Sequence, residues 1–194
     1  MPTRLALLLF TAVPFAAIAA DSYTLDPVHT YPYFSVEHFG LSMLYGRFNK
    51  SAGKFTIDRA AKTGSVELVI DTATVDTGDS EKGSRPRTRD DLLRSADFFD
   101  AAEFPKMTYR ATNVVFSGNT PSMIDGSLTL LGVTRPVKLT VERFKCNPPS
   151  GRSKERCGGN ASGKLKRSDF GMNREISAIG DEITLMVIFE GTKD

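Results

Sequence analysis

The side chains most often used in catalysis are few in this 194-residue chain, and they are poorly spaced for it. His29 and His38 are its two histidines; they lie nine residues apart on an alternating segment, which is not the spacing of a metal-binding helix. The chain has neither a G-x-S-x-G motif for a nucleophilic serine nor a glycine-rich phosphate loop. Helix capping explains the acid pair Asp90-Asp91. We therefore predict no catalytic residue and no metal site, and we place His38 at the rim of an apolar core.

The first twenty residues predict a signal peptide rather than a part of the fold. Arg4 precedes an apolar run from Leu5 to Ile18, and small residues lie just before the first acid, Asp21. The run is too short to span a bilayer; a buried N-terminal helix is the alternative. Removal of residues 1–20 takes the formal charge from +2 to +1 and leaves residues 21–194 as one domain. A nearly neutral domain argues against a nucleic-acid partner.

The two cysteines, Cys146 and Cys157, are separated by ten residues. In an exported chain, an even and closely spaced pair is typical of a disulfide that closes a loop. Thiol catalysis or metal binding would need C-x-x-C spacing or nearby histidines, and this segment has neither. We predict a Cys146–Cys157 disulfide, worth about 3 kcal/mol in the chain-entropy model.

Beyond the leader, apolar and polar residues alternate with a period of two. "VELVI" at 66–70, "KMTYRAT" at 106–112 and "PVKLTVERF" at 136–144 each place apolar side chains on one face, as half-buried antiparallel strands do. Turn residues such as Gly118-Asn119 separate the runs. The pattern predicts a short lead-in at 23–25 and eight longer strands, near residues 30–38, 44–58, 65–75, 106–116, 123–131, 136–145, 160–168 and 182–191.

Eight strands that each have one apolar face can close into a barrel with room for packed side chains or for one ligand. We predict an all-β fold, an eight-stranded antiparallel β-barrel with a short helical insertion; a two-sheet sandwich is the alternative. The insertion is expected between Asp79 and Phe104, where "TRDDLLRS" begins like a capping box and Ser95 caps a further turn. Four of its apolar residues are expected to face one barrel end, as a lid or as a plug: Leu92, Leu93, Phe98 and Phe99.

A basic cluster surrounds the cysteines. Eight lysines or arginines and one acid, Glu155, lie between residues 143 and 167. One interpretation is a solvated hairpin tip. The other is a positively charged lip that steers an anionic head group or a membrane surface toward the barrel, with Arg152, Lys154 and Arg156 as its bases.

Four segments of the chain resemble the YceI family of lipocalin-like, polyisoprenoid-binding periplasmic proteins. They are "GLSMLYGRF", "RDDLLRSADFFDAAEFP", "DGSLTLLGVTRPVKLTV" and "KRSDFGMN", and the likeness covers the mature chain in order. The positions that match the family pattern are Gly46, Phe48, Arg89, Asp90, Leu93, Arg94, Ser95, Asp97, Phe98, Phe99, Asp169, Phe170 and Gly171. Two features depart from it: Leu92 stands where many members have histidine, and the cysteine-bounded loop is an addition.

The resemblance implies a lipocalin-like barrel whose tunnel holds a long isoprenoid chain, in a periplasmic carrier of a quinone or polyprenyl lipid. Apart from that lipid we expect no cofactor; transient membrane contact and a homodimer are compatible with the sequence. The apolar stretch 38–58, which contains several glycines, would form part of the tunnel wall. Its glycines would let the strand bend. The residues predicted to line the tunnel are Phe34, Val36, His38, Phe48, Phe55, Ile57, Val66, Leu68, Ile70, Met107, Tyr109, Leu128, Leu130, Leu139, Val141, Leu185 and Val187.

Two other classes of function stay open at this stage. An enzyme acting on a bound isoprenoid would need a polar group inside the tunnel, for which His38 is the distinctive candidate. A protein-interaction module would instead fill the barrel with its own side chains and dock a partner on its outer face. A continuous tunnel would separate the carrier from the module.

Overall fold

The computed structural model describes residues 20–79 and 81–194. The predicted signal peptide therefore lies outside the described residues, apart from Ala20. Among the residues described, no helix is both long enough and apolar enough to pass through a membrane.

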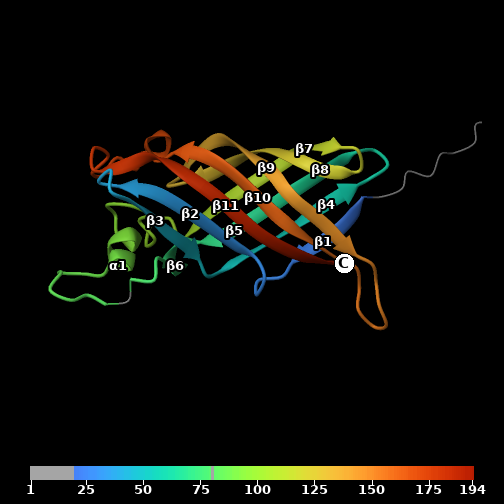
Figure 1. Cartoon of the computed structure of the whole chain (residues 1–194), viewed down its shortest axis with the longest axis horizontal. Helices are drawn as coiled ribbons and strands as arrows, with labels where there is room; N and C mark the ends of the chain where they lie inside the picture. The colour runs from blue at the N-terminus through green and yellow to red at the C-terminus, as the bar shows by residue number, and fades with distance from the viewer. Residues whose placement is uncertain (1–19, 80) are drawn as a thin grey trace, which may run out of the picture.

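A closed ring of antiparallel strands forms the body of the molecule (Figure 1). Each strand bonds to its neighbours in the order β1-β4-β5-β7-β8-β9-β10-β11, and β1 also pairs with β11, which closes the ring. The sheet is thus a barrel and the sandwich alternative is wrong. The ring strands are β1 (Asp21–Leu25), β4 (Ser51–Asp58), β5 (Thr63–Asp71), β7 (Lys106–Ser117), β8 (Thr120–Leu130), β9 (Val133–Asn147), β10 (Arg156–Lys166) and β11 (Ile179–Lys193).

Three further strands extend the barrel beyond this ring. β2 (Tyr31–His38) continues along β11 past the end of β1, β3 (Ser42–Phe48) pairs with β2, and the short β6 (Val75–Asp76) pairs with β3. β3 meets β6 only at Arg47 and Phe48, so the first part of β3 has β2 as its one strand partner among the described residues. The insertion follows β6 along the chain, and its Arg94 donates to the carbonyl of Val75 at 3.1 Å.

The predicted strands are correct in type, but two of them are interrupted. Residues 44–58 form two strands, with a break at Asn49 and Lys50, and residues 65–75 are broken by a 3-10 turn, η1 (Thr72–Thr74). The breaks are coupled: Asn49 N–H donates to the carbonyl of Thr74 at 3.0 Å, and Lys50 N–H donates to its hydroxyl at 3.1 Å. The predicted lead-in 23–25 belongs to β1, a full member of the ring, because it pairs on both edges.

The predicted insertion is present and lies at one end of the barrel's long axis (Figure 1). Its helix α1 (Arg89–Arg94) starts with the expected capping box, in which Thr88 accepts from the backbone of Asp91 and Asp91 accepts from that of Thr88. A further turn follows α1 as predicted, but the side chain of Ser95 does not cap it. Ser95 donates its hydroxyl back to the carbonyl of Leu92 at 2.7 Å, and hydrogen-bonded turns without a helix follow it.

The core runs along the barrel interior and continues under the insertion. Most inward residues of the ring strands are 8% exposed or less, and so are Phe98 and Phe99 of the insertion, while Val66 and Leu185 are partly buried against them. A second 3-10 turn, η2 (Arg167–Phe170), ends β10 earlier than the predicted residue 168 and buries Phe170. The insertion therefore packs on the same apolar interior as the strands.

The predicted disulfide is present. Cys146 and Cys157 are directly opposite each other on β9 and β10, with 4.0 Å between their Cα atoms. It closes the hairpin at the barrel end opposite the insertion (Figure 1).

We expect replacement of both cysteines by serine to lower the free energy of unfolding by about 3 kcal/mol, because the unfolded chain regains the entropy of the closed loop. Urea unfolding of the oxidised protein and the double variant measures the difference. Addition of reductant to the wild type is the control and should reproduce it. An unchanged unfolding midpoint in both cases would contradict the prediction.

Candidate functional site

An inner cavity of about 130 Å³ lies within the closed ring. Side chains from both halves of the barrel line it, and the lining contains no acid, base or histidine. Its polar side-chain atoms are hydroxyl groups, and that of Tyr109, a residue 5% exposed, donates to the carbonyl of Val137 at 2.9 Å. Burial raises the pKa of Tyr109, so this phenol is neutral at physiological pH. The cavity offers a ligand apolar contacts and no ionised group.

A wider cavity of about 570 Å³, the insertion cavity, lies between the barrel end and the insertion. The two cavities share five lining residues and are thus neighbouring sections of one interior: Phe34, Phe48, Met107, Leu128 and Leu185. The charged lining of the insertion cavity is almost entirely basic, with five arginines and one acid, Glu175. The interior therefore changes from apolar and neutral in the ring to basic near the insertion.

All seventeen residues that the sequence predicts as tunnel lining border one of these cavities. Fourteen line the inner cavity, and the other three, Val36, His38 and Leu130, line the insertion cavity. Strand alternation explains this agreement, since a closed sheet sends every second side chain inward. His38 ends β2 with its ring edge-on to that of Phe39, 4.5 Å between ring centroids, so it lies at the rim rather than deep inside.

The sequence did not single out the arginines of the insertion cavity. Arg167 is 2% exposed and donates to three backbone carbonyls, those of Met172, Ile179 and Gly180, at 2.9 to 3.0 Å. The other four come from the insertion and from the loop before β11: Arg85, Arg87, Arg89 and Arg174. In the sequence, Arg89 is marked only by the family pattern, and Arg167 is one of the eight bases of the cluster around the cysteines. Arg85, Arg87 and Arg174 look like ordinary surface bases.

Three phenylalanines pack together where the two cavities meet. The ring centroids of Phe34 and Phe48 are 5.8 Å apart, and that of Phe99 from the insertion lies 5.3 Å from Phe48 and 6.3 Å from Phe34. Gly46 faces Phe34 across the β2–β3 pair, and a Cβ there would lie 2.4 Å from its ring. Gly46 therefore makes room for an aromatic ring, which corrects the expectation that it bends the strand.

Ion pairs hold the insertion in place. Arg85 binds both carboxylate oxygens of Asp79 at 2.7 Å, and the backbone N–H of Arg89 donates to the same carboxylate at 3.0 Å. The bond from Arg85, helped by that from Arg89, lowers the pKa of Asp79 to about 2. Asp97 accepts from Arg87 at 3.0 Å and from Arg174 at 3.2 Å, which links the insertion to the loop before β11.

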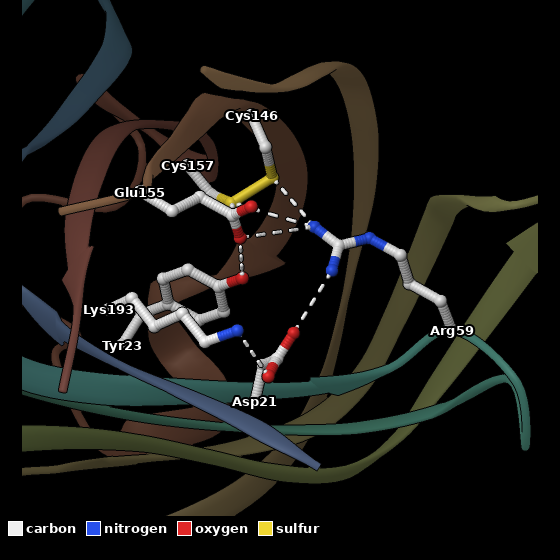
Figure 2. Close-up of a disulfide and its surroundings, with 7 residues drawn as sticks. All are labelled: Asp21, Tyr23, Arg59, Cys146, Glu155, Cys157 and Lys193. Atoms are coloured by element: carbon white, nitrogen blue, oxygen red, sulfur yellow. Dashed lines mark hydrogen bonds and ion pairs between the residues drawn. A yellow bond between two sulfur atoms is a disulfide. The ribbon is translucent and has the colours of Figure 1, made fainter. Parts of the chain in front are cut away.

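The disulfide end carries a separate polar cluster (Figure 2). Arg59 lies 3.0 Å from the sulfur of Cys146 and 3.2 Å from Asp21, and the hydroxyl of Tyr23 donates to Glu155. Burial, together with the bond to Glu155, raises the pKa of Tyr23 to about 12. The cluster is a network of paired charges around the disulfide.

Three metal-binding residue types meet in that cluster, because ligand atoms of Cys146, Glu155 and Cys157 lie within 4.8 Å of one another. The two sulfurs are bonded to each other and are not thiolates, so they are unsuited to a metal. The guanidinium of Arg59, 3.7 Å from Glu155, supplies the positive charge there instead.

The predicted steering bases also lie at this end. Arg156 pairs with Asp26 at 2.6 Å and with Glu190 at 3.3 Å, while Arg152 and Lys154 are exposed on the hairpin. None of the three lines the inner or the insertion cavity. Their role in steering stays a prediction, and the bases that do border an apolar cavity are at the opposite end.

Fold and site together define a lipocalin-like barrel, a small closed sheet with an apolar cavity inside the ring and a wider cavity beside the insertion. Residues 23–190 match the YceI-like domain, and the chain belongs to this family. It is 36% identical over 182 residues to Protein YceI of Escherichia coli, an alignment that covers 92% of this chain and 90% of that protein.

Two solved structures share the fold. BcnA of Burkholderia cenocepacia superposes with a TM-score of 0.65 at 22% identity, over 87% of this chain and 99% of that one. A polyisoprenoid binding domain from Saccharophagus degradans superposes with a TM-score of 0.60 at 16% identity, over 89% and 98%. The barrel architecture is thus common to proteins of low sequence similarity.

We expect Gly46→Ala to destabilise the protein by about 1–3 kcal/mol, because the added methyl group displaces the ring of Phe34. The Phe34→Ala background is the control, since without the ring the methyl group has space. Urea unfolding of the single and double variants measures the coupling. An equal effect of Gly46→Ala in both backgrounds would refute this account of the glycine.

The ion pair of Asp79 makes a pH-dependent contribution to stability. Because the folded-state pKa lies below the ordinary value of 3.8, the contribution is complete above about pH 4 and is lost as the pH falls toward 2. Asp79→Asn should therefore have a lower Tm than the wild type at pH 6, and the two should converge near pH 2. Thermal unfolding of both proteins between pH 6 and pH 2 tests this prediction. A Tm difference that stays constant with pH would contradict the role given to the Asp79 ion pair.

Proposed function

We propose that this protein binds a long-chain polyisoprenoid lipid, of the quinone or polyprenyl type, and carries it within the periplasm. The tail lies in the inner cavity, and the end that bears the head group lies in the insertion cavity. The observation that carries the proposal is the inner cavity lined without any ionised side chain, which shares five lining residues with a wider cavity bordered by arginines. The Saccharophagus degradans domain, a polyisoprenoid binding protein of the same fold, supports it.

The energetics of such binding are dominated by the tail. Each buried CH₂ contributes about 0.8 kcal/mol, so about twenty buried carbons supply roughly 16 kcal/mol before the entropic cost of association. A carrier therefore needs to bury only part of a long tail. Contacts with the head group then set selectivity and release more than affinity.

An interior without reactive groups suits a carrier. Quinone and polyprenyl tails have no charge, and a wall without ionised groups holds them without chemical change. The disulfide supports an oxidising compartment such as the periplasm, as does the predicted leader. We assign the protein no catalytic step.

The first experiment is native mass spectrometry of protein purified from the periplasm without detergent, followed by organic extraction of whatever is released. A long-chain isoprenoid at one per protein supports the proposal and identifies the cargo. A lipid-free protein that also takes up no added quinone or polyprenyl lipid would overturn it and favour an interaction module.

Two variants test where the tail lies. Leu68→Glu and Leu139→Glu each place a carboxylate in the wall of the inner cavity, and we expect the retained lipid to fall more than about tenfold because a charge is costly to bury beside an alkyl chain. Thr140→Glu, on the outward face next to Leu139, is the matched control and should retain lipid. Normal retention by folded Leu68→Glu and Leu139→Glu proteins would contradict this placement.

A further inference from the structure

Exposed apolar side chains gather at the insertion end of the barrel. Of the eight large hydrophobic residues that are exposed in the described part of the chain, four lie on the β2–β3 hairpin and one on the loop before β11. We call this group the apolar tip: Phe39, Leu41, Met43, Tyr45 and Ile176. Leu41 is 86% exposed, Tyr45 68% and Phe39 57%, so these side chains are barely covered by the rest of the fold. The other three exposed residues are scattered singly, as is ordinary for a protein surface.

The two loops of the apolar tip are joined to each other. Phe39 N–H donates to the carbonyl of Ala178 at 2.7 Å, and His38 pairs with Ile179 where β2 meets β11. Arg167 holds the base of the second loop through the carbonyls of Met172, Ile179 and Gly180. These bonds hold the two loops of the apolar tip next to each other, at the barrel end that carries α1 (Figure 1).

The apolar tip borders the insertion cavity. Tyr45 belongs to both, and His38 and Glu175, which line the cavity, are chain neighbours of Phe39 and Ile176. A surface that covers the tip would therefore lie beside the insertion cavity.

The bases beside the tip are arginines that line the insertion cavity. Arg87 and Arg174 pair with Asp97, and Arg174 also lies 3.5 Å from Glu175, so these two arginines and two acids carry no net charge. Arg89 has no ion pair within the described residues and supplies the unpaired positive charge there. Glu37 is the exposed acid on β2 beside the hairpin.

We propose that the apolar tip docks on a bilayer that contains anionic phospholipids, with its side chains at the boundary of the acyl chains and the neighbouring arginines among the phosphates. Amphipathic surface binding of this kind combines buried apolar side chains with bases at the head-group level. A second copy of the chain fits less well, because a stable protein interface uses about 20–30 residues on each side and the tip offers five apolar side chains. A role of this docking in lipid transfer rests on the proposed function. The docking on a bilayer does not depend on it.

Flotation with vesicles of phosphatidylethanolamine and phosphatidylglycerol tests the proposal. The Phe39→Ser, Leu41→Ser double variant changes two exposed residues that line neither cavity, and we expect its bound fraction to fall at least about tenfold. The matched control is Val28→Ser with Val115→Ser, which removes exposed apolar side chains on the β1–β2 connection and on β7 and should float like the wild type. Arg87→Gln with Arg174→Gln should weaken flotation at low salt more than at about 0.5 M salt.

The outcomes separate docking from lipid carriage. Loss of flotation in the tip variant, with extracted lipid equal to that of the wild type, supports both proposals; the same loss in a protein that never holds lipid supports docking alone. Equal flotation of the wild type and the tip variant overturns the proposal, and so does a wild type that fails to float. If light scattering then shows a wild-type dimer that the tip variant loses, the occupant of the tip is a second copy.

Discussion

Closure of the sheet by one short strand is the constraint on which the rest of the structure depends. β1 is five residues long, yet it bonds to β4 on one edge and to β11 on the other, so the ring has no free edge at that end. Every ring strand therefore has a hydrogen-bonded neighbour on both edges. The interior is consequently left to side chains alone. An apolar cavity free of ionised groups is compatible with stability only when the backbone around it is hydrogen-bonded within the sheet.

The extension beyond the ring creates the difference between the two barrel ends. β2 and β3 continue the wall where β1 and β4 end, but β6 is too short to pair with the whole of β3. The insertion occupies that side, and its Phe98 and Phe99 join the core while its arginines face the wider cavity. At the other end, the hairpin is closed by the disulfide, and Arg59 pairs with Asp21 and Glu155 beside it (Figure 2), while Arg152 and Lys154 are exposed on the hairpin. One end of the barrel thus carries a hairpin closed by a disulfide, and the other carries a cavity bordered by arginines together with exposed apolar residues.

Buried hydroxyl groups within the ring are neutral and hydrogen-bonded. The phenol of Tyr109 reaches the carbonyl of Val137, and the hydroxyl of Ser51 donates to the carbonyl of Thr30 at 2.9 Å. Buried groups that already have partners have little reason to bind a ligand head group, so they do not compete with the apolar contacts of a tail. Together with the family membership, this chemistry makes binding of an apolar chain the function that the site fits best.

The sequence by itself determined the strands, the cysteine pair, the capped helix and the inward residues from Phe34 to Val187, because strand alternation and helix capping are local properties of the chain. It left barrel and sandwich open, since closure depends on β1 meeting β11, strands that are more than 150 residues apart in the sequence. It also could not locate the breaks at Asn49 and Thr72–Thr74, which arise from hydrogen bonds between two separate segments. Nor could it show which bases border a cavity: Arg87 and Arg174 meet at Asp97 only because the insertion folds back on the loop before β11, and such a contact is decided by tertiary packing.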